Sequence, residues 1–425
     1  MKAVVLAAGE GRRLRPLTYT RPKHMIPVCG KPILEHLINS LKASGIEKIL
    51  IVVNYKADVI KEYFGDGSKH SAKIEYVYQR EISGTASAIL SAREHVNEPF
   101  LAVNGDILAP PETIKQAMDR FNLGDVNATL AAVRVDRPGE FGVLKVKNGE
   151  LIDIIEKPAI DFPSNLINAG IYVFSPDIFD YIERTKMTER GELEITESIR
   201  LMIRENKRVS VVEVSGERWL DIGRPWDLLE ANARLLSQIK PAILGEVEDG
   251  ARIKGPVFVD EGVLVRSGSY IEGPVFIGGG SDIGPNCYIR PYTSIGRNVR
   301  VGNACEIKNS MLMDNVHVGH LSYIGDSIIG ENCNLGAGSI SANLRFDRKT
   351  VKMRIKGEVV DSGRVKMGVV MGDNVLTGVG ALFMPGVTIG CNCWIGPNVV
   401  VYDDVPPNTI LILKQHMRRG LIQQK

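Results

Sequence analysis

The stretch IGGGSDIGPNCYIRPYTSIGRNVRVGNACEI, residues 277–307, decides the fold of the C-terminal half of this chain. An aliphatic residue returns at every sixth position through it, and glycine follows four of these residues. A six-residue period is typical of a short strand and a tight turn, with one aliphatic side chain per repeat directed into a stacked interior. The pattern therefore predicts a left-handed parallel β-helix whose coils bury their core against one another. The repeating positions are Ile277, Ile283, Ile289, Ile295, Val301 and Ile307.

The repeat is interrupted on its C-terminal side. Its phase slips by one residue near Asn315, resumes at Val318-Gly319, and returns late at Ile389-Gly390. Between these points, residues 344–368 are irregular and rich in Lys and Arg. We expect this segment to project from the β-helix as a loop, and loops on regular scaffolds often carry function.

The N-terminal half has a different pattern, in which short apolar runs alternate with helical stretches. Residues 32–44 have apolar side chains at helical spacing and end before Gly45. This alternation predicts a Rossmann-like α/β domain with a mostly parallel sheet, to which residues 126–173 add antiparallel strands. We place the domains at 1–240 and 241–425, after a helix expected over 225–240. The expected parallel strands are 3–7, 49–53, 74–78 and 100–103.

Composition narrows the possible functions. The chain has 425 residues and a formal charge of +2, which gives no global field for nucleic acid or an anionic membrane. No apolar run approaches the roughly 20 residues that span a bilayer, so we expect a cytoplasmic protein. Its six cysteines are widely spaced, which favours reduced packing thiols over a disulfide framework.

The first predicted strand leads into Gly9-Glu10-Gly11-Arg12-Arg13. Two glycines let backbone N–H groups approach a phosphate, and arginines add charge-assisted hydrogen bonds to it. The motif lacks the third glycine of a dinucleotide-binding fingerprint and the Lys-Ser/Thr ending of a P-loop. It therefore favours a phosphate-binding loop of another kind.

With the motifs that follow it, this loop resembles the sugar nucleotidylyltransferase family. The family signature is an apolar strand, Gly-x-Gly-Thr-Arg, a later Pro-Lys, and a Lys-Pro that opens a helix. Arg12 stands here in place of the threonine, while Arg13, Pro22-Lys23 and Lys31-Pro32 match the other elements. Further matches run through the domain in order, at Gly84-Thr85-Ala86, Asn104-Gly105-Asp106, Glu156-Lys157-Pro158, Asn168-Ala169-Gly170 and Trp219-Leu220-Asp221.

The resemblance implies transfer of a nucleotide from UTP or dTTP to a sugar-1-phosphate, with release of pyrophosphate. Arg13 and Lys23 would be catalytic, and Asp106 and Asp221 would hold Mg²⁺, a cation that prefers oxygen ligands. The nucleotide would contact Leu6, Ala8, Gly9, Gly11, Gln79, Gly84 and Thr85. The sugar phosphate would contact Gly142, Glu156, Lys157 and Asn168.

The predicted β-helix contains His320-Leu321-Ser322-Tyr323-Ile324-Gly325-Asp326. This stretch resembles the acetyltransferase domain of bacterial bifunctional enzymes that make UDP-N-acetylglucosamine, with Arg290, Lys308 and Asn334 in register. Archaeal fused nucleotidylyltransferase/acetyltransferases are still more similar, through residues 341–347.

The second resemblance implies direct acetyl transfer from acetyl-CoA to an amino-sugar-1-phosphate. His320 would be the general base, a role that imidazole suits near neutral pH. In the bacterial pattern a lysine follows Asn343 closely, and Lys349 and Lys352 are candidates here. The other acetyltransferase residues implied are Arg290, Lys308, Tyr323, Asn334 and Asn343 for the sugar phosphate, and Ala337 for acetyl-CoA.

The sequence thus predicts a bifunctional enzyme that makes a UDP-N-acetyl-hexosamine and assembles as a homotrimer or a higher multiple. Two alternatives stay open. One is a glucose-1-phosphate thymidylyl- or uridylyltransferase whose β-helix serves only to form the trimer. The other is a catalytically silent regulatory or scaffold subunit.

Overall fold

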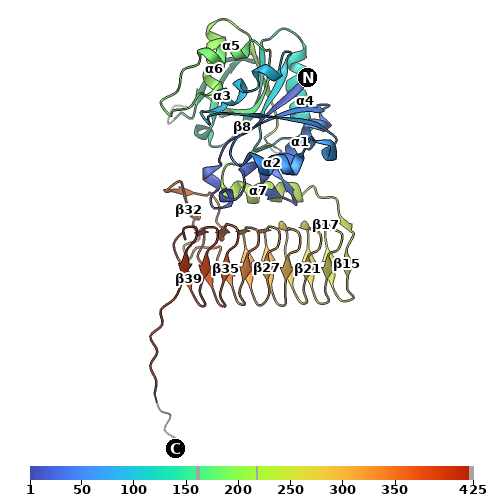
Figure 1. Ribbon diagram of the computed structural model, residues 1–425, viewed down its shortest axis with the longest axis vertical. Helices are drawn as coiled ribbons and strands as arrows, with labels where there is room; N and C mark the ends of the chain where they lie inside the picture. Colours follow the sequence, from blue (N-terminus) through green and yellow to red (C-terminus); the bar gives the residue numbers. More distant parts are fainter. Residues whose placement is uncertain (159–162, 217–218, 421–425) are drawn as a thin grey trace, which may run out of the picture. The chain divides into compact units, whose positions relative to one another are not determined.

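A computed structural model describes residues 1–158, 163–216 and 219–420. The chain divides into two compact units, and each is described by itself (Figure 1). The first unit holds residues 1–11, 21–27 and 31–223, and the second holds residues 12–20, 28–30 and 224–425. The segment Arg12–Thr20, which follows the first strand in sequence, thus groups with the second unit.

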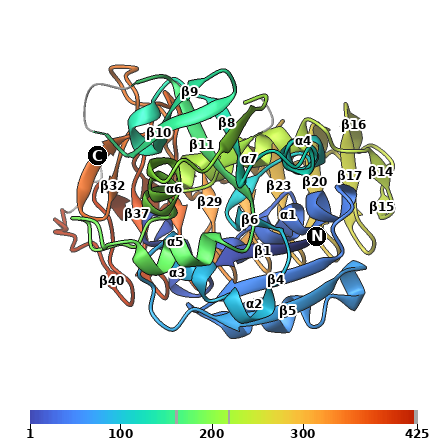
Figure 2. The ribbon, with the colours of Figure 1, turned by 90° about the horizontal axis from the view of Figure 1, so that it is seen from above.

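The first unit is built on a mixed sheet of nine strands in the order β5-β4-β1-β6-β11-β8-β12-β10-β9. Strands β5, β4, β1 and β6 are mutually parallel and lie side by side (Figure 2), whereas β11 runs antiparallel to β6. The predicted parallel core and the antiparallel addition are both confirmed. The strands are β1 Lys2–Ala7, β4 Lys48–Val53, β5 Lys73–Tyr78, β6 Phe100–Asn104, β8 Ala128–Arg134, β9 Gly142–Lys147, β10 Glu150–Glu156, β11 Leu166–Phe174 and β12 Val209–Glu213.

Helices cover both faces of this sheet because strands that alternate with helices are apolar on both sides. One buried cluster joins the sheet to α1, α2 and α4, and a second joins its other face to α3, α5 and α6. The helices are α1 Ile33–Ala43, α2 Ala57–Phe64, α3 Thr85–Leu90, α4 Pro111–Asn122, α5 Ile178–Arg184 and α6 Ile195–Arg204; short elements are β2 Pro27–Val28, β3 Lys31–Pro32, β7 Ile107–Leu108, β13 Leu220–Asp221 and the 3₁₀ turns η1 Arg12–Leu14, η2 Leu17–Tyr19, η3 Lys23–Met25, η4 Ser68–His70, η5 Arg93–His95 and η6 Pro138–Glu140.

The second unit begins with α7, Pro225–Leu236, which ends four residues before the expected Lys240. A left-handed parallel β-helix follows, as the six-residue period predicts, and its coils stack from β15 to β39 (Figure 1). Each coil contributes one short strand to each of three parallel sheets. Sheet 1 holds β14 Ala242–Ile243, β17 Val257–Val259, β20 Val275–Ile277, β23 Thr293–Ile295, β26 Met311–Leu312, β29 Ile328–Ile329, β34 Val370–Met371 and β37 Thr388–Ile389.

The other two sheets complete the triangular coil. Sheet 2 holds β15 Glu246–Val247, β18 Leu264–Val265, β21 Asp282–Ile283, β24 Arg300–Val301, β27 His317–Val318, β30 Asn334–Leu335, β35 Leu376–Thr377, β38 Trp394–Ile395 and β40 Ile410–Leu411. Sheet 3 holds β16 Arg252–Lys254, β19 Tyr270–Glu272, β22 Tyr288–Ile289, β25 Glu306–Lys308, β28 Tyr323–Gly325, β31 Ile340–Ser341, β36 Leu382–Phe383 and β39 Val400–Val401.

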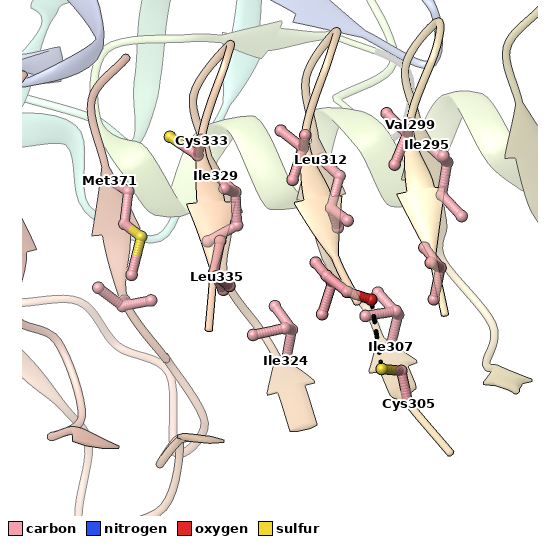
Figure 3. Close-up of a cluster of buried hydrophobic side chains, with 14 of the residues drawn as sticks. Ile295, Val299, Cys305, Ile307, Leu312, Ile324, Ile329, Cys333, Leu335 and Met371 are labelled. Atoms are coloured by element: carbon pink, nitrogen blue, oxygen red, sulfur yellow. Dashed lines mark hydrogen bonds between the residues drawn. The ribbon is translucent and has the colours of Figure 1, made fainter. Parts of the chain in front are cut away.

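The repeating aliphatic residues fill the interior of the β-helix, and Figure 3 shows a section of this core. Ile277 pairs with Ile295, but Ile295 pairs with Leu312, one residue closer along the chain. The phase slip is therefore a coil shortened by one residue that keeps its inward column intact. All six positions of the 277–307 repeat are fully buried.

The irregular segment departs from the prediction of a plain loop because it contains an antiparallel hairpin. Strands β32 Lys352–Ile355 and β33 Glu358–Asp361 form it, with Lys356-Gly357 at the turn (Figure 1). Both turn residues have positive φ, 52° and 87°, as a tight hairpin turn requires. Its base is closed by a bridge between Leu344 and Lys366.

None of the helices in the described part of the chain is long and apolar enough to cross a bilayer. All six cysteines lack a disulfide, as predicted, and five of them are buried. Burial raises the pKa of the Cys287 and Cys333 thiols to about 12. Their S–H groups donate instead to carbonyls in the next coil, as Cys305 does to Val318 at 3.3 Å.

This burial predicts the pattern of thiol labelling. At pH 9 an ordinary exposed thiol is already largely thiolate, whereas Cys287 and Cys333 stay neutral until the pH nears about 12. Titrating the native protein with an aromatic disulfide reagent at pH 9 should therefore label Cys29 first, the half-buried cysteine. The other five should react only after denaturation, and rapid labelling of more than one thiol in the native protein would contradict this packing.

Candidate functional site

The carboxyl ends of the parallel strands gather the candidate nucleotide residues at one edge of the sheet. Gly9 follows β1, Gln79 follows β5, and Asp106 follows β6. The backbone N–H of Gly105 donates to the carbonyl of Leu6 at 2.9 Å, which ties the ends of β1 and β6 together. Leu6 and Ala8 are almost completely buried, so their contribution to this edge is mainly through the backbone.

The two candidate metal ligands meet through a short antiparallel ribbon of β7 and β13. Asp221 pairs with Ile107, and the N–H of Ile222 donates to the carbonyl of Asp106 at 2.9 Å. Lys23 forms an ion pair with the carboxylate of Asp106. The backbone thus brings Asp221 near Asp106 and Lys23, and carboxylate oxygens are ligands that suit a divalent cation.

His24, which sequence reasoning missed, lies beside Lys23 in η3, and its ring lies close to Gly105. Burial lowers the pKa of His24 to about 3, with a further contribution from the neighbouring ammonium of Lys23. The side chain is therefore neutral and supports the packing at Gly105, where an added Cβ would lie 3.0 Å from its ring. In the sequence, its position directly after the Pro22-Lys23 motif was the signal that could have identified it.

The predicted base-recognition residues form one connected network. The amide of Gln79 donates to the carbonyl of Gly84 at 3.1 Å and to the hydroxyl of Ser87 at 2.6 Å. Gly84 has a φ of 123°, and an added Cβ would lie 2.3 Å from the carbonyl oxygen of Leu193. Thr85 then accepts a hydrogen bond from the N–H of Ile195 at 3.0 Å.

The predicted sugar residues lie on β9, β10 and β11. Gly142 pairs with Glu156, and a Cβ at Gly142 would lie 2.9 Å from the Glu156 carboxylate. Asn168 donates to the hydroxyl of Tyr172 at 2.6 Å and accepts from the N–H of Gly170 at 3.1 Å. Lys157 lies 3.5 Å from Glu156, half-exposed, so this pair contributes little to stability.

Arg13 is the predicted nucleotidyl-transfer residue that falls in the other compact unit. It belongs to η1, whereas Gly9 and Gly11 remain with the first unit. Arg13 also lines a pocket of the second unit, together with Arg12 and Arg15.

A second group of candidate residues meets on sheet 3 of the β-helix, around the buried carboxylate of Asp326. Lys308 approaches it at 2.8 Å, Asn309 donates to it at 2.7 Å, and Asn343 donates to it at 2.5 Å. Asn343 also donates to the hydroxyl of Tyr323 at 3.0 Å. Stacking of successive coils causes this convergence because Lys308 and Gly325 are paired neighbours.

Gly325 has no side chain, and this leaves room for the side chains of the Asp326 cluster. A Cβ on Gly325 would lie 2.3 Å from the Tyr323 hydroxyl and 2.8 Å from the Asn343 amide. Burial raises the pKa of Tyr323, so its hydroxyl stays protonated and can donate to a ligand. Asp326 was part of the quoted motif, yet nothing in the sequence marked it as the centre of the cluster.

Arg290 belongs to the same column as Lys308, one coil earlier. Its N–H donates to the carbonyl of Ile307 at 2.8 Å, and its guanidinium pairs with Glu306 at 2.7 Å. The guanidinium also lies 5.4 Å from the ring centre of Tyr288. Arg290 and Lys308 thus present two positioned cations on one face.

His320 lies at the corner between sheets 2 and 3, in the turn that precedes Tyr323. Its carbonyl accepts a hydrogen bond from Gly338 at 3.1 Å, which stacks the Ala337 turn against it. Its side chain is exposed and makes no hydrogen bond or ion pair within the described ranges. A turn through Leu321 and Ser322 separates it from Tyr323 of the Asp326 cluster. Asn334 lies on sheet 2, outside that cluster.

The structure places a further lysine, Lys366, beside Asn343. Lys352 begins the first strand of the hairpin and Lys349 precedes it in sequence. The second strand then runs antiparallel to the first, back toward Lys366. Lys366 bridges Leu344, and the N–H of Met367 donates to the carbonyl of Asn343 at 2.9 Å. Lys366 is exposed beside Asn343. No local signal could reveal it, because the insertion separates the two residues in sequence.

Together these sites define a nucleotidyltransferase domain followed by a hexapeptide-type β-helix that carries a second polar site. The nucleotidyl transferase family model matches residues 2–238, and the model of the GMPPB C-terminal domain matches residues 271–376. A solved UDP-glucose pyrophosphorylase, in complex with UDP-glucose, is 27% identical with a TM-score of 0.51, over 56% of this chain and 98% of that one.

Relatives that match nearly the whole chain show which family it belongs to. The bifunctional protein GlmU of Methanocaldococcus jannaschii is 46% identical over 98% of both chains. A bifunctional sugar-1-phosphate nucleotidylyltransferase/acetyltransferase of Sulfurisphaera tokodaii is 45% identical over 95% of this chain and 98% of that one. The chain belongs to this family of bifunctional nucleotidylyltransferase/acetyltransferases.

The close approach at Gly325 predicts a selective loss of function. Substituting Gly325→Ala must displace Tyr323 and Asn343, because the new methyl group would overlap the phenol. We expect acetyl transfer to fall at least tenfold while nucleotidyl transfer stays unchanged, measured by thiol release and pyrophosphate release on one preparation.

Gly319→Ala is the matched control. A Cβ at Gly319 meets nothing within 4 Å, and its φ lies outside the left-handed range. This variant should keep both activities. Equal losses in the two variants would mean that glycine content, rather than space beside Tyr323, governs the site.

Proposed function

We propose that the chain makes a UDP-N-acetyl-hexosamine in two steps. The β-helix acetylates an amino-sugar-1-phosphate with acetyl-CoA, and the first unit then transfers a uridylyl or thymidylyl group to the sugar phosphate. The observation that carries this proposal is the convergence of Lys308, Tyr323 and Asn343 on Asp326, because a β-helix that serves only assembly has no need for it.

In nucleotidyl transfer, a phosphate oxygen of the sugar-1-phosphate attacks the α-phosphorus of the triphosphate. A new P–O bond forms, the bond to the β-phosphate breaks, and pyrophosphate leaves with the electron pair. Several negative charges meet, so positioning and charge neutralisation dominate catalysis. Lys23 would neutralise charge at the α-phosphoryl group, and Arg13 would act on the triphosphate.

Asp106 and Asp221 would hold Mg²⁺. Their adjacency fits a hard cation, and no set of three His, Cys, Asp or Glu side chains able to hold a metal occurs among the residues described. Substrate oxygens and water would therefore complete the coordination shell. When bound, the ion supplies charge neutralisation at the phosphates.

In acetyl transfer, the sugar amine attacks the thioester carbonyl, a C–N bond forms, and the C–S bond breaks. His320 takes the proton that the amine loses, and the departing thiolate of coenzyme A takes up a proton to leave as the thiol. Arg290 and Lys308 would bind the sugar phosphate, which lies away from the reacting amine, and Ala337 would contact acetyl-CoA. Tyr323, Asn334 and Asn343 would orient the sugar.

We further infer that Lys366 is the lysine that accompanies Asn343, in place of Lys349 or Lys352. Its bridge to Leu344 supports this assignment. The base-facing and sugar-facing roles of Gln79, Gly84, Thr85, Gly142, Glu156, Lys157 and Asn168 rest on the family pattern and on their hydrogen-bonded arrangement. The trimer and the cytoplasmic location stay predictions.

Removal of the Asp106 carboxylate should separate the two activities. Asp106→Ala leaves the Lys23 ammonium without its partner and removes a candidate metal ligand. We expect pyrophosphate release to fall at least a hundredfold and acetyl transfer to persist. Asp119→Ala, an exposed acidic residue of α4, is the control and should be neutral. Unchanged nucleotidyl transfer in Asp106→Ala would overturn the metal assignment.

Removal of the His320 imidazole should have the reverse effect. We expect His320→Ala to lose coenzyme A release from acetyl-CoA with glucosamine-1-phosphate or galactosamine-1-phosphate, at least a hundredfold, while nucleotidyl transfer continues. His317→Ala, an exposed histidine three residues earlier, is the matched control. Should native protein release no coenzyme A with either sugar, the β-helix would be an assembly device and the nucleotidylyltransferase alone would stand.

A further inference from the structure

The segment Arg12–Thr20 carries Arg13 and belongs to the second unit, although it follows the first strand in sequence. It is built from the two short 3₁₀ turns η1 and η2, and such turns have poor hydrogen-bond geometry. Leu14 and Leu17 are fully buried, but apolar packing has no directional preference. Polar contacts with the rest of the second unit must therefore set the position of the segment.

The first polar contact joins Thr20 to a buried carboxylate of the β-helix. The hydroxyl of Thr20 donates to Oδ2 of Asp373 at 2.6 Å, and Asp373 is only 4% exposed. The other carboxylate oxygen accepts from the backbone N–H of Glu331, in the preceding coil, at 2.8 Å. A hydrogen bond to a carboxylate is short and strong because one partner carries a full charge. This bond therefore fixes the end of the segment against the β-helix.

The second contact lies one coil further along the β-helix, at Pro16. The thiol of Cys391 donates to the carbonyl of Pro16 at 3.6 Å. Gly372 leaves room for this approach, since an added Cβ there would lie 3.2 Å from the Cβ of Pro16. Gly372-Asp373 and Gly390-Cys391 are equivalent corners of neighbouring coils, because the strands that precede them, β34 and β37, are paired. Two adjacent corners of the β-helix thus hold the segment at two points.

Asp373 differs from the equivalent residue of an earlier coil. Asp314 also lies two residues after its strand of sheet 1, and its carboxylate accepts from the N–H of Arg297 at 2.8 Å. Asp373 makes this same corner bond and in addition accepts from the Thr20 hydroxyl. In the described part of the chain, no side chain donates to Asp314. The corner bond thus belongs to the coil itself, whereas the bond to Thr20 holds the attached segment.

We propose that Asp373 is a positioning residue for nucleotidyl transfer. Pro16 and Thr20, the two residues that are held, lie in sequence between Arg13 and Lys23, the two cations proposed for that reaction. Without the Thr20 bond the stretch that joins these cations is free to shift, and catalysis falls steeply when a reacting or charged group is misplaced. The inference rests on the proposed roles of Arg13 and Lys23, and it goes beyond them by assigning a residue of the β-helix to nucleotidyl transfer.

The test compares Asp373→Ala with its matched control, Asp314→Ala, in the full chain. Both substitutions remove a corner carboxylate and its bond to a backbone N–H, and only the first releases Thr20. We expect kcat for pyrophosphate release from UTP and N-acetylglucosamine-1-phosphate to fall at least tenfold in Asp373→Ala and to stay within twofold in Asp314→Ala. The KM for the sugar phosphate should not change, since its proposed contacts lie on or directly after β9, β10 and β11. Acetyl transfer should persist in both variants.

A second pair of variants tests the same bond from the side of Thr20. Thr20→Val replaces the hydroxyl with a methyl group, whereas Thr20→Ser keeps a hydroxyl that can donate to Asp373. The valine variant should lose as much kcat as Asp373→Ala, and the serine variant should stay within threefold of native protein. Combining Thr20→Val with Asp373→Ala should lower kcat no further than either change alone, because both remove one interaction.

Unchanged kcat in both Asp373→Ala and Thr20→Val would refute the proposal, and so would an equal loss in Asp314→Ala. Amide hydrogen exchange of peptides that cover residues 12–20 gives a readout that needs no activity. Exchange should be faster in Asp373→Ala than in native protein or in Asp314→Ala, and equal exchange in all three would show that Asp373 does not hold the segment. Native protein without nucleotidyl transfer would instead refute the proposed function, so the two failures are distinguishable.

Discussion

The stacking register of the β-helix is the constraint on which the second site depends. Each six-residue repeat places one aliphatic residue inward, and the parallel hydrogen bonds between coils then fix every outward side chain in a column. A one-residue slip would turn each buried residue outward, so the register is held by the whole interior. Arg290, Lys308 and Gly325 share a column for this reason, although they are distant in sequence.

The first unit reaches the same result by different means. Parallel strands end at one edge of the sheet, so residues from separate strands meet there without a continuous motif. The ribbon of β7 and β13 then brings Asp221 beside the end of β6, although the two are far apart in sequence. In both units the backbone hydrogen bonds fix the positions of the functional residues. The side chains then supply the chemical groups.

Most of the architecture could be predicted because its signals are local and repeated. The six-residue period, the four parallel strands and helix α1 are read from short windows, and each agrees with the fold. The residues that sequence analysis missed depend on contacts between segments that are distant in sequence. Lys366 returns to Asn343 after an inserted hairpin, and Asp326 becomes a centre only when three coils stack. Contacts of this kind depend on tertiary pairing, which one sequence does not encode locally.

The two cations of the β-helix site each have a carboxylate partner, and this pairing bears on selectivity. Lys308 and Arg290 each pair with a carboxylate, so their net field is small and their orientation is fixed. A lysine ammonium has three donors and Asp326 takes one, so the others remain available in set directions. Such a site selects a ligand by hydrogen-bond geometry.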